Sequence, residues 1–384
     1  MPRGTMEPGA GGRTVPRRAF LLLWSGQSVS LVGSQITALA LPLVAALTLG
    51  ATAWDMGLLA ACARAPYLVL GLPAGVWVDR LPRRPLLVAC ALGQAAALAV
   101  VPLADTAGAL SVPLLCGVAF VAGAFAVFGD IGTLALVPLV VPPDRLTKAQ
   151  GALETSQSTA QIAGPALAGW LVAVVGAPVA LLADALSFLV SGATLAGIRV
   201  RATLDRAGGA LDGVRLVFGQ RLLRQVTLCT ATHVFWVNAF LALLPLHLTR
   251  EGLSPGRIGV TLAIGAAGGL VGALVAPRLG ERVMPVAIAV AGLGAAGVVL
   301  HPLAIAVMWF GVQVYHVLQV PVRYRLTPPA FHGRVNAAIR TTVWGTAPLG
   351  ALLGGVLAET AGLAPALLVS GAGAGLACLW LVRR

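Results

Sequence analysis

Four ionisable side chains fall inside long apolar segments of the chain: Arg64, Asp130, Glu154 and Asp184. A charge within hydrocarbon is costly, so such residues pair with one another or carry out a function. Because burial favours the protonated form of a carboxyl group, the three acids are candidates for proton coupling. We expect Arg64 and Asp184 to form an intramembrane ion pair. For Asp130 a role in gating or proton transfer and a purely structural role both stay open.

A short charged loop separates two apolar segments at residues 75–84. Gly75 and Asp79 close the first segment, and Arg80, Arg83 and Arg84 follow. Such a hairpin cannot lie inside hydrocarbon, so it lies at a membrane face, and its basic residues favour the cytoplasmic side. The glycine would let two helices approach closely, and the aspartate can accept hydrogen bonds from a neighbouring helix N-terminus or an arginine.

The elements that must position these residues are membrane helices. The chain is 58% hydrophobic and only 10% charged, which excludes an ordinary soluble protein. Few aromatics and no alternating strands argue against an outer-membrane barrel. Apolar runs long enough to cross ~30 Å of hydrocarbon recur along the sequence. We therefore expect an all-α polytopic membrane protein with twelve transmembrane helices, at residues 19–47, 54–78, 85–104, 112–137, 150–175, 178–198, 226–248, 256–277, 283–300, 302–322, 338–358 and 363–382.

The basic residues predict the topology. With the N-terminus inside, 23 of the 26 Lys and Arg fall in cytoplasmic segments, so the net charge of +13 is explained by the positive-inside rule without nucleic acid. Both termini are then cytoplasmic. The predicted parts are a tail at 1–18, a six-helix half at 19–198, a cytoplasmic linker with an amphipathic helix on membrane lipid at 199–225, and a second half at 226–384.

The fifth predicted helix has small residues along one face. They follow the pattern Gly151-x8-Ala160-x3-Gly164-Pro165-x2-Ala168-Gly169, which gives a flat surface for another helix, and Pro165 is expected to add a kink. The segment Ala273–Arg282 aligns with Gly75–Arg84 but lacks the aspartate. The two halves are therefore expected to be related by pseudo-symmetry.

Together these motifs resemble the major facilitator superfamily. The pattern Gly-x-x-x-Asp-Arg-x-x-Arg-Arg at 75–84 resembles the signature loop of that family, with Pro82 where the family usually has Gly. The glycine face around Gly164 and Gly169 is similar to the antiporter signature of drug/proton exporters. Further stretches resemble the bacterial macrolide- and siderophore-exporter-like branch, at residues 23–34, 144–146, 184–188 and 333–335.

The resemblance implies a gating role for the loop at 75–84 and a central cavity lined by the first, fourth, seventh and tenth helices. Asp130 is the only carboxylate on those four helices. Any single polar residue there more often bridges helices than meets solute, but the group favours a site for a bulky, amphipathic, weakly charged solute. The substrate-cavity candidates are Gln27, Ser30, Ser34, Gln35, His233, Trp236, Asn238, Trp309, Gln313 and His316.

Motifs of enzymes and metal sites are missing from the sequence. There is no Walker-type Gly-Lys-Ser/Thr, no HExxH and no GxSxG, and the five cysteines are scattered in apolar segments. We therefore expect no enzyme activity, no metal and no cofactor. The remaining energy source is an ion gradient, with protons favoured.

The sequence is thus interpreted as a monomeric exporter of the bacterial inner membrane with a major facilitator fold. It would exchange protons for an amphipathic small molecule, such as an antibiotic, siderophore or secondary metabolite, by alternating access. One alternative is an importer or facilitator on the same fold. The other is a non-transporting membrane scaffold or sensor.

Replacing Asp79 by Asn tests the loop. Loss of one charge-assisted contact is expected to weaken the outward-facing state by ~1.5–3 kcal/mol. Labelling of engineered cysteines from the periplasm should fall while expression stays near that of the unchanged protein. Unaltered labelling and transport would contradict a gating role.

Overall fold

The computed structural model describes residues 17–142, 145–198, 211–328 and 331–382, and within these ranges the chain is almost entirely helical. Ten of its helices are long and apolar enough to cross a membrane. The second and ninth predicted spans are also helical, which gives the twelve that the sequence predicts. The helical membrane class and the two-half arrangement are therefore confirmed.

The first half contains six long helices. They are α1 (Arg17–Leu43) with the short π-helix η1 (Val44–Thr48), α2 (Ala53–Arg80), α3 (Arg83–Thr106), α4 (Val112–Val140), α5 (Leu146–Val175) and α6 (Ala177–Ala196). In this half α1 packs on α5 and α6, α3 on α4 and α6, and α2 on α4.

The second half begins after a short helix in the linker. The elements are α7 (Leu211–Gly219), α8 (Arg221–Arg250), α9 (Pro255–Val275), η3 (Ala276–Arg278), η4 (Glu281–Val283), α10 (Met284–Gly297), η5 (Pro302–Ala304), α11 (Ile305–Leu326), α12 (His332–Trp344), α13 (Ala347–Ala361), α14 (Leu363–Leu376) and α15 (Leu379–Val382). Helix α7 packs against α8 and α12. The tail at 1–16 and the linker segment 199–210 lie outside the described residues, and the predicted boundaries of the two halves stay predictions.

Glycines in left-handed conformation mark equivalent connections in the two halves. Gly50 and Gly252 follow the first helix of each half with φ of 61° and 79°. Gly176 and Gly362 separate the fifth and sixth helices with φ of 83° and 94°. Only glycine adopts this region without steric cost, so the repeated positions support the internal pseudo-symmetry.

The eleventh predicted span is not one helix. It was expected at 338–358, but the structure has α12 and α13 with a break at Gly345 and Thr346. Pro348 has no N–H for the carbonyl of Trp344, so the regular hydrogen bond is missing there. At this break the Thr346 hydroxyl is shared between the carbonyl of Val343 on α12, at 2.7 Å, and that of Ala231 on α8, at 3.1 Å.

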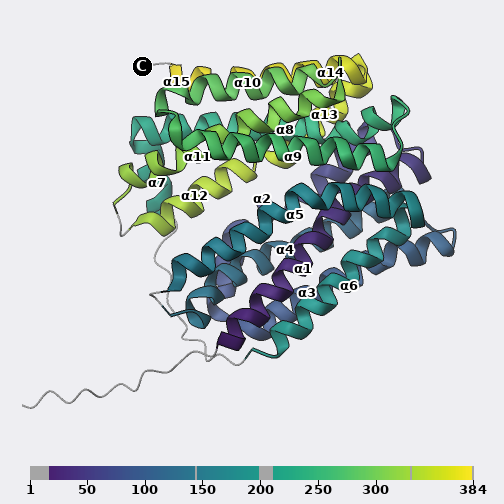
Figure 1. Ribbon diagram of the computed structural model, residues 1–384, viewed down its shortest axis with the longest axis horizontal. Coiled ribbons are helices and arrows are strands. Elements are labelled where there is room, and N and C mark those ends of the chain that lie inside the picture. The colour runs from purple at the N-terminus through teal and green to yellow at the C-terminus, as the bar shows by residue number, and fades with distance from the viewer. Residues whose placement is uncertain (1–16, 143–144, 199–210, 329–330, 383–384) are drawn as a thin grey trace, which may run out of the picture.

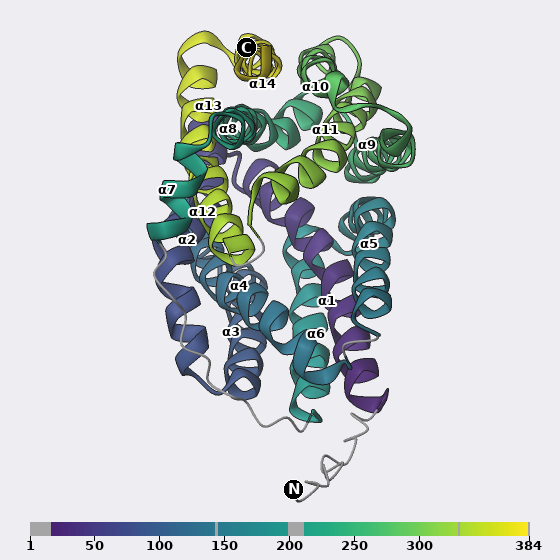
Figure 2. The same cartoon turned by 90° about the vertical axis from the view of Figure 1, so that its left-hand side faces the viewer.

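The halves meet along two seams, α2 against α13 and α5 against α9. A Cβ added to Gly57 would lie 2.8 Å from Cα of Gly355, and one added to Gly169 would lie 2.9 Å from Cα of Gly259. Both seams lie toward one end of the bundle. We call this the opposite end, and we call the end with Arg83 and Arg84 at the α2–α3 turn the basic end. Toward the basic end the two groups of helices diverge (Figures 1 and 2).

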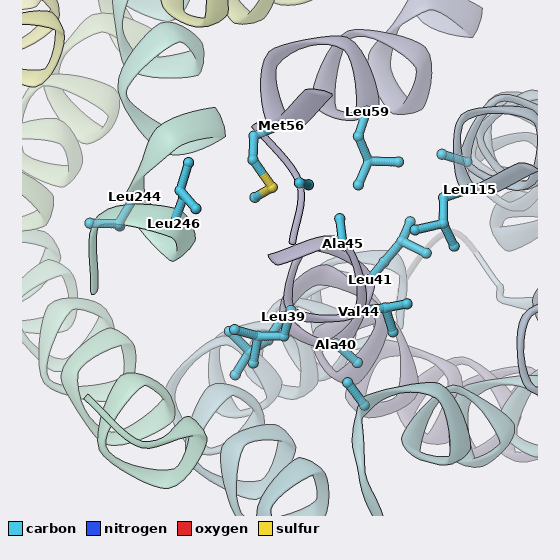
Figure 3. Packing of buried hydrophobic residues seen from close by; sticks show 14 of the residues in the cluster. Leu39, Ala40, Leu41, Val44, Ala45, Met56, Leu59, Leu115, Leu244 and Leu246 are labelled. Atoms are coloured by element: carbon cyan, nitrogen blue, oxygen red, sulfur yellow. The ribbon is translucent and has the colours of Figure 1, made fainter. Parts of the chain in front are cut away.

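A continuous apolar core fills the opposite end. It joins residues of α1, η1, α2 and α4 to residues of α8 from the other half. Leu39, Met56, Leu244 and Leu246 lie together in this cluster (Figure 3). All four are buried. The contact between the halves at this end is therefore packed like a protein interior.

Replacing Gly57 by Val tests this contact. The added side chain meets the backbone of Gly355 and Ala351. Overpacking costs ~1–3 kcal/mol, which changes a two-state population by roughly 5- to 150-fold. Nitroxide labels at Ala109 and Glu251, on exposed turns of the two halves at this end, should therefore move to longer distances in double electron–electron resonance.

Gly71→Val is the matched control, because Gly71 lies on the same helix with no atom within 4 Å of an added Cβ. It should leave the distance distribution unchanged. Equal distributions for Gly57→Val and the parent protein would contradict the proposed seam.

Candidate functional site

A hydrogen bond between α2 and α4 holds the acid that sequence analysis singled out. The Tyr67 hydroxyl donates to Oδ2 of Asp130 over 2.8 Å, and the Asp130 side chain is exposed. Because the tyrosine occupies only one carboxylate oxygen, the other can take up a proton or meet a ligand.

A cation–π contact joins the two halves beside this acid. The Arg64 guanidinium carbon lies 5.6 Å from the ring centre of Trp344. The ring of Tyr67 lies 6.3 Å from the same indole. Leu68 adds a contact one residue further on, since a Cβ on Gly345 would lie 3.0 Å from its Cδ1. Helix α2 therefore touches the α12–α13 break through successive side chains.

A second arginine approaches from the other half. Arg340 lies on α12, one turn before Trp344, with an exposed side chain. Its charge and that of Arg64 both act on Asp130 and on Tyr67. The cluster thus has two cations around one carboxylate, so its net charge is +1 when Asp130 is ionised and +2 when it is protonated.

Asp184 has a different environment. Its carboxylate accepts hydrogen bonds from Thr37 at 2.5 Å and Ser187 at 2.8 Å, and it is 1% exposed. Gly33 makes this approach possible, because a Cβ there would lie 2.4 Å from Oδ1 of the acid. Asp184 therefore fastens α6 to α1.

The predicted ion pair between Arg64 and Asp184 needs correction. Within the described part of the chain, the contacts of Asp184 are with α1 and its own helix, and Arg64 lies on Trp344. The sequence argument matched two charges by depth. Depth alone does not reveal that the hydroxyl groups of Thr37 and Ser187 donate hydrogen bonds to Asp184, or that Arg64 packs on the ring of Trp344.

The loop at 75–84 lies at the basic end, where α2 ends at Arg80 and α3 begins at Arg83. Arg84 donates to the backbone carbonyl of Ala196 at the end of α6. The surroundings of Gly75 and Asp79 lie outside the described side chains. Glu154, the remaining acid candidate, is exposed on the part of α5 nearer this end.

The glycine face of α5 contacts two helices. Gly164 faces Gln35 of α1, whose Cβ would be 2.5 Å from an added Cβ. Further along, Gly169 meets Gly259 of α9, and a Cβ on Gly259 would lie 2.3 Å from the carbonyl oxygen of Pro165. The predicted flat face therefore exists in the structure and packs against the other half.

The substrate-cavity candidates are not brought together as one group. His233 is buried, with Nδ1 3.1 Å from the carbonyl oxygen of Ala374 on α14. Trp236 packs on the same helix at Gly373, and Asn238 donates to its own helix. Trp309 and Gln313 pack on α9. Ser30 is buried, and seven candidates are partly exposed: Gln27, Ser34, Gln35, Trp236, Trp309, Gln313 and His316.

Three residues of the cluster were missed by sequence analysis: Tyr67, Arg340 and Trp344. Tyr67 follows Arg64 by three residues, so the two share a helix face, which was a usable signal. Arg340 begins a largely apolar stretch and was counted only as a loop charge. Trp344 offered no signal, because its role depends on packing between the halves. In the described residues no group of three or more His, Cys, Asp or Glu could hold a metal ion.

Measurements of the free energy of unfolding of variants distinguish the environment of Asp184 from that of Arg64. Thr37→Val and Asp184→Ala should each lower the free energy of unfolding by ~1.5–3 kcal/mol, since each removes a hydrogen bond to a charged group. The two effects should be coupled. Those of Arg64→Ala and Asp184→Ala should add within ~0.5 kcal/mol, because the side chains share no partner. Unfolding in detergent of the three single and two double variants tests both expectations, and coupling between Arg64 and Asp184 would restore the original pairing.

Comparison with known proteins places this geometry in a family. The profile described as Major Facilitator Superfamily matches residues 23–322. Macrolide efflux protein A of Streptococcus pyogenes is 25% identical over 92% of both chains. The multidrug efflux pump Tap of Mycobacterium tuberculosis is 29% identical over 90% of this chain and 88% of its own.

Among solved structures, a bacterial homologue of the iron transporter ferroportin in its inward-facing state superposes with a TM-score of 0.77 at 19% identity, covering 95% of this chain and 98% of that one. That likeness concerns the fold. The family match covers most of the chain. This chain therefore belongs to the Major Facilitator Superfamily and is a multi-pass membrane transporter.

Proposed function

We propose that the protein is a proton-coupled exporter of an amphipathic small molecule. The observation that carries the proposal is Asp130, an exposed carboxylate at membrane depth beside the Arg64–Trp344 contact, with one oxygen bound by Tyr67. Such a group exchanges protons with water more readily than the enclosed Asp184. Efflux proteins among the relatives support the direction of transport.

The proposed orientation puts the basic end in the bacterial cytoplasm, with both termini on that side. Exposed arginines at the helix ends support it, including Arg80 at the end of α2 and Arg282 before α10. The halves pack together at the opposite end, so this conformation would open inward. The ferroportin homologue quoted above is also named as inward-facing.

The mechanism would be alternating access, with the halves rocking about their contact. In the inward-open state Asp130 would release its proton to the cytoplasm and solute would enter. In the outward-open state a proton from outside would replace the departing solute. The proton gradient is then the energy source.

The proposed solute class rests on the chemistry of the cluster and on the relatives. Tyr67 and Trp344 present aromatic rings beside polar groups, which suits molecules with both apolar bodies and polar substituents. The relatives are named for macrolide and multidrug efflux. A macrolide antibiotic is therefore the first compound to test.

Asp130→Asn should abolish concentrative export and leave binding and downhill exchange measurable, because the amide keeps the shape but cannot carry the proton. Everted vesicles with and without an imposed pH gradient would measure uptake of a radiolabelled macrolide and of ethidium. Glu359→Gln removes an exposed carboxylate near the end of α13, to which no role in proton coupling is assigned, and is the matched control. If the Asn variant still concentrates either probe, Asp130 is not the carrier, and Asp184, Glu154, His233 and His316 follow as candidates.

A further inference from the structure

We propose that Arg340 is the residue of the second half that converts the protonation of Asp130 into movement. The ionised carboxylate would form an ion pair with Arg340 when the basic end closes, and protonation would break that pair. This inference rests on the proposed proton coupling. It adds Arg340, in the second half, as a positioning residue, a role that neither the fold nor the relatives assign.

Asp130 and Arg340 lie on the same side of the contact between the halves. Arg64 touches Trp344 at that contact. Asp130 is bound by Tyr67, which follows Arg64 by three residues on α2, so the tyrosine backbone lies ~4.5 Å nearer the basic end than that of Arg64. Arg340 precedes Trp344 by four residues on a helix that starts at the basic end, so it lies ~6 Å nearer that end. Both groups are therefore on the side where the halves diverge.

The second step is that only one cation can change its distance to Asp130. Arg64 belongs to α2, which packs on α4 within the same half, so a rigid rotation of the halves carries it along with the acid. Arg340 belongs to α12 in the other half. Its charge already acts on Asp130 in this conformation. Closing the basic end would bring the two into contact.

The third step concerns the other groups that face Asp130. Helix α2 contributes Arg64 and Tyr67, and α3 contributes Cys90, whose Cβ is 4.0 Å from a Cβ added at Gly129. Helix α1 has no ionisable residue between 19 and 43. Asp130 is the acid on which the charge of Arg340 acts, and the other carboxylates of α2, α3 and α4 lie near the ends of those helices.

The direction of the coupling follows from the charges. An ionised Asp130 attracts Arg340 and favours closure of the basic end, so the protein turns outward after the proton has left. A proton arriving from outside neutralises the acid and leaves Arg340 facing Arg64 without a counterion. That repulsion reopens the basic end. Each cycle would therefore move a proton inward and allow solute outward.

The test measures the conformation directly and needs no solute. Nitroxide labels at Gln150 and Arg282, exposed residues at the basic end of the two halves, would report its opening in nanodiscs between pH 5 and 9. The parent protein should shift to short distances as the pH rises, because the ionised acid closes this end. Arg340→Gln should abolish the shift and stay open, and Arg340→Lys should retain part of it.

Arg325→Gln is the matched control, since Arg325 is in the same half and pairs with Glu281 in that half. It should leave the pH response intact. The reversal Asp130→Arg with Arg340→Asp should restore a response that either change alone removes. A normal response in Arg340→Gln together with a lost one in Asp130→Asn would overturn this inference and leave proton coupling standing. Responses and concentrative export that survive both changes would overturn the coupling as well.

Discussion

The structure depends on backbones that touch where the two halves meet. Helices in a bilayer gain nothing from hiding apolar surface, because lipid is equally apolar, so they associate by close van der Waals contact. Gly57 with Gly355 and Gly169 with Gly259 provide that contact on two seams. Both pairs join helices of different halves, so they set where the halves touch, and the apolar core around Met56 and Leu244 completes the closure.

The role of an acid at membrane depth depends on where it lies relative to this contact between the halves. An acid sealed within one half, such as Asp184 between Thr37 and Ser187, is satisfied in place and fixes two helices together. An acid where the halves part, such as Asp130, has an exposed side chain and lies in the field of arginines from both halves. The chemical group is identical in the two places. Its neighbours decide whether it serves the fold or the transport cycle.

Much of the fold could be predicted from sequence because hydrophobic runs and basic loops are local signals. The helix ends at Arg80, Val175 and Arg250 follow from charges and glycines nearby in the chain. The flat face of Gly164 and Gly169 was also readable, since small residues at helical spacing have one purpose in packing. The break after Trp344 was missed, although Gly345 and Pro348 stand beside it, because a single proline is common within membrane helices.

The site was less predictable, since its members come together only through tertiary contacts. His233 and Trp236 lie on a helix that the family resemblance assigns to the cavity, yet they pack against α14 of their own half. Helix number alone therefore gives a poor estimate of which face a side chain occupies. Arg64 had been matched with Asp184 by depth, and the structure instead places it on an aromatic ring from the other half.

The size of the proposed coupling is physically reasonable for a position so close to the contact between the halves. Two unit charges 4 Å apart at an effective dielectric constant of 20 interact by ~4 kcal/mol, and part of this is lost to desolvation when the pair forms. Inverting a population from 1:99 to 99:1 requires about 5.5 kcal/mol. One ion pair near Arg64 and Trp344 is therefore insufficient to lock either state, but it can bias the equilibrium between them. A transporter needs such a bias, because a state held by much more energy could not be reversed by a single proton.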